Sequence, residues 1–313
     1  MPLKDSLNGY LRLPRDFFGI PQPTAGDPDV GVLGIPYDLT SSYMPGTRFG
    51  PDAIRKATDS ERSHSYPLSI GQSSANNDKA LSKRITLEDI GDLEVSLRLP
   101  EQAMIDITEA AAKLGEQDSH LLFMGGDHFI TYPLLRGLNR SNPGTYGLVY
   151  LDAHADFYSA YSGHPYSHAT TLRRILTDGL IERVNLLTHD LRAALPEQKA
   201  ELVKIGAVIP KSLKSFVKAI NKIAMQVNTI YISVDLDVLD PSVAPGVSHP
   251  ESGGLSMVEL VELLRACFAT GKVKYVDIAE LNPLVDTTGR TSVTARDVVK
   301  EILTGFASQK DYK

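Results

Sequence analysis

The chain has 313 residues, 42% of them apolar, which is enough to bury a substantial core. Its 38 acidic and 32 basic residues give a formal net charge of −6, so no excess of positive charge points to nucleic acid or an anionic membrane. The single cysteine, Cys267, excludes a disulfide within the chain, and its apolar-periodic surroundings favour a role in helix packing. The first residues lack the apolar segment of a signal peptide, and no run approaches the ~18 residues of a membrane span. We therefore expect a soluble, cytoplasmic protein.

Short apolar runs alternate with longer segments of helical periodicity along most of the chain. The runs predict strands at residues 30–35, 84–87, 120–124, 146–151, 184–188, 207–209, 229–234 and 274–278. Helices are expected at residues 52–58, 102–114, 211–227 and 257–270, the first of them after a turn at residues 47–51. This alternation predicts an α/β fold, a three-layer α/β/α domain around a mostly parallel, roughly eight-stranded sheet.

No internal repeat or shift in composition marks a domain boundary. We interpret residues 1–313 as a single domain, with an N-terminal extension over residues 1–25 and a frayed tail over residues 308–313. A polar stretch at residues 73–78 predicts a flexible loop.

Aspartates and histidines follow three of the predicted strands. The clusters are Gly125-Gly126-Asp127-His128, Asp152-Ala153-His154-Ala155-Asp156 and Asp235-Leu236-Asp237-Val238-Leu239-Asp240-Pro241. Ligands of open α/β sheets bind beyond the carboxyl ends of the strands, so the three clusters are expected to meet at one edge. If the strand that ends at Leu151 continues through Asp152, alternation points Asp152, His154 and Asp156 to one side.

A single aspartate at a strand end often caps a helix or closes a turn, and each of these aspartates alone fits that role equally well. Together, four carboxylates and two histidines from three strand ends favour a metal site. Carboxylates mixed with imidazoles suit manganese or another first-row ion, and the lack of cysteine in the set disfavours structural zinc. Two such ions ~3.5–4 Å apart would deprotonate a bridging water and give a hydroxide nucleophile.

These clusters, together with residues 46–55 and Glu280-Leu281-Asn282-Pro283, resemble the motifs of the ureohydrolase family, the arginase and agmatinase group. The resemblance covers most of the chain. It implies an arginase-like fold and hydrolysis of a guanidino group to urea and an amine, with two Mn²⁺ per subunit. It also implies a homotrimer or homohexamer that acts on a small guanidino substrate.

The resemblance implies roles for individual residues. One manganese would be held by His128, Asp152, Asp156 and Asp235, and the other by Asp152, His154, Asp235 and Asp237, with Asp152 and Asp235 as bridges.

Further roles follow for residues outside the metal set. Glu280 would pair with the substrate guanidinium, and His168 would bind substrate and carry protons to the leaving amine. The alternatives are a structural salt bridge for Glu280 and an ordinary core or surface histidine for His168. Asp127 and Asp240 would support the loops.

Several segments depart from the family pattern and bear on the substrate. Residues 157–164 replace the loop that holds the amino-acid end of arginine in arginases, so arginine is disfavoured. Ala169 replaces the glycine usual after His168. The altered turns at residues 188–192 and 245–251 contain His189 and His249, either of which lines an altered pocket or fills a surface position; we favour the pocket for His249. Agmatine and the guanidino acids remain open as substrates.

Two other functions remain open. The first is a non-catalytic relative that uses the fold for binding or regulation, although complete ligand sets argue against it. The second is an amide hydrolase of the related deacetylase class, which uses one zinc; the presence of ligands for a second ion disfavours it.

Overall fold

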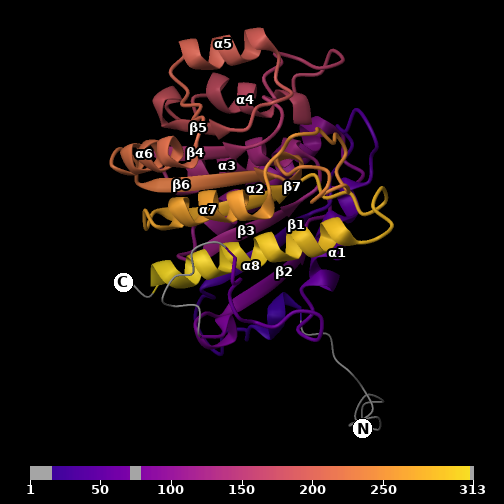
Figure 1. Cartoon of the computed structure of the whole chain (residues 1–313), viewed down its shortest axis with the longest axis vertical. Helices are drawn as coiled ribbons and strands as arrows, with labels where there is room; N and C mark the ends of the chain where they lie inside the picture. The colour runs from indigo at the N-terminus through magenta and orange to yellow at the C-terminus, as the bar shows by residue number, and fades with distance from the viewer. Residues whose placement is uncertain (1–15, 71–78, 311–313) are drawn as a thin grey trace.

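The computed structural model describes residues 16–70 and 79–310. Within them a seven-stranded sheet runs in the order β2-β1-β3-β7-β6-β4-β5, and every neighbouring pair is parallel (Figure 1). The strands are β1 (Val30–Ile35), β2 (Leu87–Asp92), β3 (His120–Gly125), β4 (Tyr146–Leu151), β5 (Leu186–His189), β6 (Thr229–Asp235) and β7 (Val273–Ala279). The predicted α/β architecture with a parallel sheet is therefore confirmed.

Two of the eight expected strands are placed differently. The run at residues 207–209 makes only an isolated bridge between Val208 and Leu187, which leaves seven strands in the described part of the chain. The run at residues 84–87 precedes the true strand, β2, which begins at Leu87 and continues through the polar sequence to Asp92. Aspartate, glutamate and glycine are uncommon in strands, and β2 tolerates them because it is a half-exposed edge strand.

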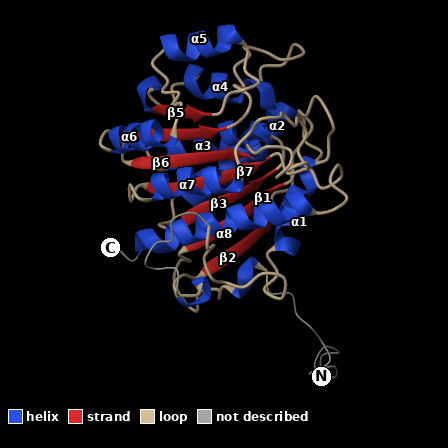
Figure 2. Cartoon of the chain, viewed as in Figure 1, coloured by secondary structure: helices blue, strands red, loops and turns tan. Residues whose placement is uncertain are grey.

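Helices cover both faces of the sheet (Figure 2). They are α1 (Gly50–Ala57), α2 (Pro100–Gly115), α3 (Thr131–Ser141), α4 (Thr171–Thr177), α5 (Pro196–Lys204), α6 (Leu213–Ala224), α7 (Met257–Phe268) and α8 (Arg290–Lys310). Buried residues of α1, α6, α7 and α8 form one core, and those of α2, α3, α4 and α5 form the other. Strand β6 serves both cores, since Ile230 and Ile232 face the first and Tyr231 faces the second.

The chain ends are more ordered than predicted where the structure describes them. Phe17 and Phe18, within the expected N-terminal extension, are each 2% exposed and belong to the core. Helix α8 continues to Lys310 because the Gln309 amide bonds both the N–H and the carbonyl of Val273, so residues 308–310 are helical and not a frayed tail. Residues 1–15, 311–313 and the predicted loop at 73–78 lie outside the described residues.

Two expectations from composition can also be compared with the structure. Cys267 is fully buried in α7, as predicted for a packing residue. Among the described helices, none combines the length and apolar character that crossing a membrane requires.

The sheet order brings the expected site residues together. Strands β3, β7, β6 and β4 are consecutive in the middle of the sheet, and each is followed by one of the predicted acidic or histidine-containing segments. Because these strands are parallel, their carboxyl ends lie at the same edge.

Candidate metal centre

A sharp turn after β3 positions His128. Gly126 has a φ of +33°, and a Cβ there would lie 2.3 Å from the carbonyl oxygen of Tyr37, so only glycine fits this position. Asp127 then accepts hydrogen bonds from the backbone N–H and hydroxyl of Thr40, at 3.1 and 2.7 Å. These contacts tie the turn to the loop after β1, which agrees with the supporting role expected for Asp127.

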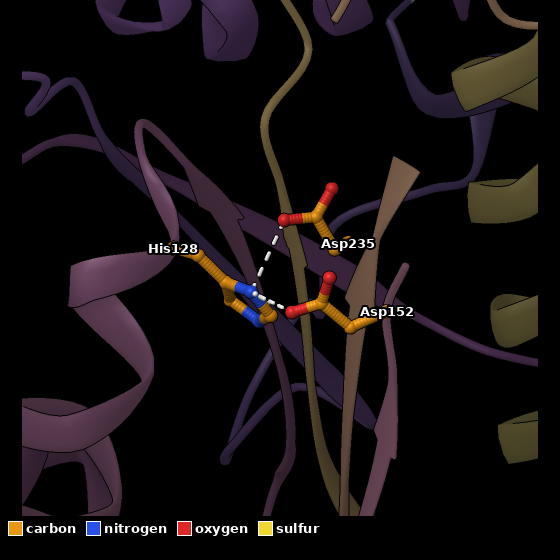
Figure 3. Close-up of side chains that lie close together, drawn as sticks. All are labelled: His128, Asp152 and Asp235. Atoms are coloured by element: carbon orange, nitrogen blue, oxygen red, sulfur yellow. Dashed lines mark hydrogen bonds and ion pairs between the residues drawn. The ribbon is translucent and has the colours of Figure 1, made fainter. Parts of the chain in front are cut away.

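A first group of side chains surrounds Nδ1 of His128. This nitrogen lies 3.0 Å from Oδ2 of Asp152, 3.1 Å from Oδ2 of Asp235 and 3.3 Å from Oδ2 of Asp156. Figure 3 shows His128, Asp152 and Asp235 pointing toward one another from separate segments. One imidazole nitrogen and several carboxylate oxygens from three strand ends thus meet in one small volume.

A second group shares Asp152 with the first. Nδ1 of His154 lies 2.8 Å from Oδ2 of Asp237 and 3.5 Å from Oδ1 of Asp152. The candidate ligand atoms of His128, Asp152 and Asp235 lie within 4.8 Å of one another, and so do those of Asp152, His154 and Asp237, close enough for a single ion to contact each set of three. The six residues predicted as metal ligands are therefore brought together.

The convergence after β4 arises in a different way from the one predicted. Strand β4 ends at Leu151, so Asp152, His154 and Asp156 do not alternate along a strand. They lie in a loop, and Asp156 has a positive φ of 47°, uncommon for a residue other than glycine. The hydroxyl of Tyr150 holds Asp156 by donating to its Oδ2 at 2.7 Å.

Two residues that the sequence analysis did not identify fix the tautomer of His128. Ser233 donates its hydroxyl proton to Oδ1 of Asp277 at 2.8 Å, so its oxygen is left to accept from Nε2 of His128, also at 2.8 Å. With one proton fixed on Nε2, Nδ1 is the nitrogen that faces the carboxylates, and its lone pair becomes available to a metal ion when the ion displaces the proton that Nδ1 shares with them. Asp277 was visible in the sequence as an acidic residue inside an apolar strand, and the cost of burying it was the available signal.

The crowded carboxylates oppose one another electrostatically. Burial, followed by repulsion from Asp237 and Asp152, raises the pKa of Asp235 well above its usual value. Burial and the neighbouring aspartates likewise raise the pKa of Asp152. Burial works against the charged form of His128, but its hydrogen bonds to Asp152 and the other aspartates outweigh burial and raise its pKa well above the ordinary range. Divalent cations offset this repulsion, and mixed carboxylate and imidazole donors suit a first-row ion, so the residues fit two metal ions.

Glu280 lies beside the first group. It follows β7 with a φ of 66°, and its Oε1 accepts a hydrogen bond from the backbone N–H of His128 at 2.9 Å. Its Oε2 is buried and has no hydrogen-bond partner among the described residues. Burial, and then repulsion from Asp235, raise the pKa of this carboxyl well above its usual value. A buried carboxylate oxygen without a partner is costly, so this atom is available for a ligand.

His168 and His249 line the cavity above the two metal-binding groups. Nδ1 of His168 donates to the carbonyl of Thr40 at 2.6 Å, which leaves Nε2 free to face Ser42 at 3.2 Å. The Ser42 hydroxyl also lies 3.1 Å from Nε2 of His249, and the two imidazole rings stack with centroids 5.2 Å apart. The predicted placement of His249 in the pocket agrees with this geometry. His189 lies elsewhere, with its ring against Phe216.

The model of the arginase family matches residues 28–305. The chain belongs to the arginase family. An agmatinase from Bacillus cereus is 29% identical over 91% of this chain and 94% of its own length, and the mitochondrial arginase 1 of Oryza sativa subsp. indica is 32% identical over 87% and 79%. The solved structure of proclavaminate amidino hydrolase from Streptomyces clavuligerus is 30% identical, covers 95% of this chain and 98% of that one, and superposes with a TM-score of 0.79. The names of these three relatives refer to three different substrates, and their sequence identities to this chain are similar. Sequence identity alone therefore does not indicate which substrate this chain uses.

Arg192 clamps the loops of this arginase-family chain that carry the second group. Its guanidinium donates to the backbone carbonyls of Asp237 at 2.6 Å and Glu251 at 2.8 Å, and makes longer bonds to the carbonyls after Asp237. It also pairs with Asp190, whose φ is 64°. The next residue, Ala193, donates its N–H to the carbonyl of Ala153 at 2.9 Å. The altered turn at residues 188–192 thus fixes the loops that hold His154, Asp237 and His249.

We predict that Arg192→Lys weakens manganese binding by ~10-fold or more, because a lysine keeps the charge but cannot reach several carbonyls at once. Manganese affinity and stoichiometry, measured by titration calorimetry on metal-stripped protein, test this expectation. Arg183→Lys is the matched control, since Arg183 is exposed and lies outside the site. Two ions bound with unchanged affinity in Arg192→Lys would contradict the clamp.

Metal binding should strengthen as pH rises. The aspartates around His154, chiefly Asp237, outweigh the effect of burial and raise its pKa to about 12, and the pKa of His128 is also raised. Each imidazole is therefore protonated on both nitrogens near neutral pH. A metal ion must displace one of these protons, so lowering the pH favours the metal-free form. We expect affinity to fall by about tenfold per pH unit for each displaced proton between pH 8 and pH 6. Competition with a chelating dye measures this dependence, and a flat profile would contradict it.

Proposed function

We propose that this protein is a binuclear manganese amidinohydrolase, which hydrolyses the guanidino group of a small substrate to urea and an amine. The observation that carries the proposal is the pair of ligand groups that share Asp152 beside the unpartnered Oε2 of Glu280. Membership of the arginase family supports the same reaction class. In this proposal the residues of the site have three roles: they hold the metal, orient the substrate and transfer a proton.

Six side chains would hold the metal. We assign His128, Asp152, Asp156 and Asp235 to one manganese and Asp152, His154, Asp235 and Asp237 to the other. When bound, such a pair supplies a water of lowered pKa and hence a nucleophile near neutral pH. Asp152 and Asp235 are suited to serve both ions because each carboxylate has two oxygens.

Glu280 would orient the substrate. Its Oε1 is fixed by the His128 N–H, and its Oε2 is free to accept from the N–H groups of a guanidinium. A carboxylate and a guanidinium form a charge-assisted pair, and that pair also relieves the repulsion between Glu280 and Asp235. Held in this way, the guanidinium carbon would lie toward the metal groups, which is the orientation that hydrolysis needs.

His168 would carry the proton that the leaving amine needs. Because the Thr40 carbonyl can only accept, Nδ1 of His168 holds its proton and Nε2 is the nitrogen that exchanges protons in the cavity. Burial lowers the pKa of His168, so the ring is neutral at pH 7 and can take up a proton and pass it on.

The proposal is tested by urea release from manganese-loaded protein. The panel contains agmatine, arginine, 4-guanidinobutanoate, 3-guanidinopropanoate and free guanidine, with a chelated sample as the control. We expect urea from at least one guanidino compound, only when metal is present, and two ions per chain. A single ion per chain together with hydrolysis of an acylated amine would overturn the assignment in favour of a deacetylase, and no turnover of any guanidino compound would favour a binding protein.

Glu280→Gln should keep both ions and lose at least ~100-fold in kcat/KM, because the neutral amide removes the charged partner of the guanidinium. Metal content by elemental analysis and urea kinetics on the preferred substrate measure the two effects. Glu116→Gln, which makes the same change at an exposed residue after α2, is the control. Unchanged kinetics in Glu280→Gln would refute the role.

A further inference from the structure

The cavity above the metal groups has a floor and a wall of different chemistry. Its floor includes His128, His154, His168 and the acidic side chains already described. Its wall, where the rest of a substrate would lie, includes Tyr158, Tyr161, Ala193, Ala194, Gln198 and His249. A guanidinium held by Glu280 therefore leaves its tail against this wall.

No lysine or arginine lines the cavity within residues 16–70 and 79–310. Two arginines on the adjoining segments are engaged elsewhere. Arg173 bonds both oxygens of Glu201, at 2.6 and 2.8 Å, and lies over the ring of Phe157. Arg192 is bound by Asp190 and by backbone carbonyls, as described above. The wall thus provides no positive charge for the carboxylate of a guanidino acid.

Aromatic rings form a continuous chain along one side of the cavity. Ring centroids lie 5.6 Å apart for Tyr158 and Tyr161, 5.9 Å for Tyr161 and His168, and 5.2 Å for His168 and His249. Tyr43 extends the chain, with its ring 6.0 Å from that of His249. Faces of aromatic rings attract alkyl chains and cations, and they repel anions.

The polar atoms of the wall are neutral. Gln198 uses Oε1 to accept from the N–H of Leu195, and its amide NH₂ group makes no hydrogen bond to a described residue. Tyr158 and Tyr161 add two hydroxyl groups to the lining of the cavity. The tyrosine hydroxyls can accept from an ammonium or another donor, whereas the Gln198 NH₂ can only donate. None of these groups carries the positive charge that would compensate a carboxylate for the hydration that it loses on burial.

We propose that the preferred substrate is an alkylguanidine whose tail carries no negative charge, an aliphatic or alkylammonium guanidine rather than a guanidino acid. This inference rests on the proposed hydrolysis and adds the chemistry of the tail. It makes Tyr161, Gln198 and Ala193 specificity-determining residues of the same site.

The test compares three compounds of similar length that differ in the charge of the tail: agmatine, 1-butylguanidine and 4-guanidinobutanoate. We expect kcat/KM for agmatine or 1-butylguanidine to exceed that for 4-guanidinobutanoate by at least ~10-fold, since the wall offers the carboxylate no partner. A kcat/KM for 4-guanidinobutanoate equal to or above that of both other compounds would overturn the inference while leaving the proposed hydrolysis intact. Failure of all three and of the wider panel would overturn the proposed hydrolysis, and this inference with it.

A single substitution should move the preference in the opposite direction. Ala193→Arg adds a cation to the wall at a half-exposed position whose N–H bonds the backbone carbonyl of Ala153. We expect it to raise kcat/KM for 4-guanidinobutanoate relative to 1-butylguanidine by ~10-fold or more. Ala200→Arg adds the same charge on the exposed side of α5, outside the cavity, and is the matched control with an unchanged ratio. An equal shift in both variants, or none in Ala193→Arg with metal content unchanged, would contradict the role of the wall.

Discussion

The burial of several carboxylates at one edge of a parallel sheet is the constraint on which the site depends. Strands β3, β7, β6 and β4 end side by side, and the segments after them place Asp152, Asp235 and Asp237 almost out of contact with water. Without cations, burial and mutual repulsion raise the pKa of Asp152 and Asp235, so the arrangement is costly. The apolar cores on both faces of the sheet must supply the stability that holds these groups together.

Side chains behind the site fix the orientation of those in it. The Asp277 carboxylate holds Ser233, and Ser233 in turn fixes His128; Tyr150 holds Asp156. Positive φ values occur at Asp156 and Glu280, both at the site, where backbone strain is compensated by the surrounding hydrogen bonds. The geometry of the ligand groups is therefore set by the protein before any ion is bound.

The sequence predicted the parallel sheet, and it predicted that the acidic and histidine residues after its strands meet at one edge. Apolar runs located most of the strands, and the rule that ligands bind beyond the carboxyl ends of parallel strands brought the acidic clusters together. The strand propensities of the residues did not predict β2, because its polar residues are tolerated only in an edge strand. They also predicted a strand at residues 207–209, where the short apolar run makes only one bridge. Strand alternation was the wrong reason for the convergence of Asp152, His154 and Asp156, because the chain leaves the strand at Leu151 and turns.

Contacts between distant segments were beyond sequence reasoning. Arg192 bonds mainly to backbone carbonyls, and these have no residue-specific signal, so nothing in the sequence linked it to Asp237. The Ser42 hydroxyl lies between His168 and His249, which are 126 and 207 residues away from it along the chain. In contrast, Asp277 was detectable in principle, because an acidic residue in an apolar strand requires buried hydrogen-bond donors.

Reaction class and substrate choice depend on different parts of the chain. The groups that can hold metal follow the central strands directly, whereas the wall that would contact the substrate tail comes largely from the segments at residues 157–164, 188–194 and 245–251. Loops accept substitution more readily than the ends of buried strands, since they run over the surface and pack less tightly. Changes in these segments can therefore alter the charge and shape of the wall while the carboxylates, fixed by the sheet, keep their positions.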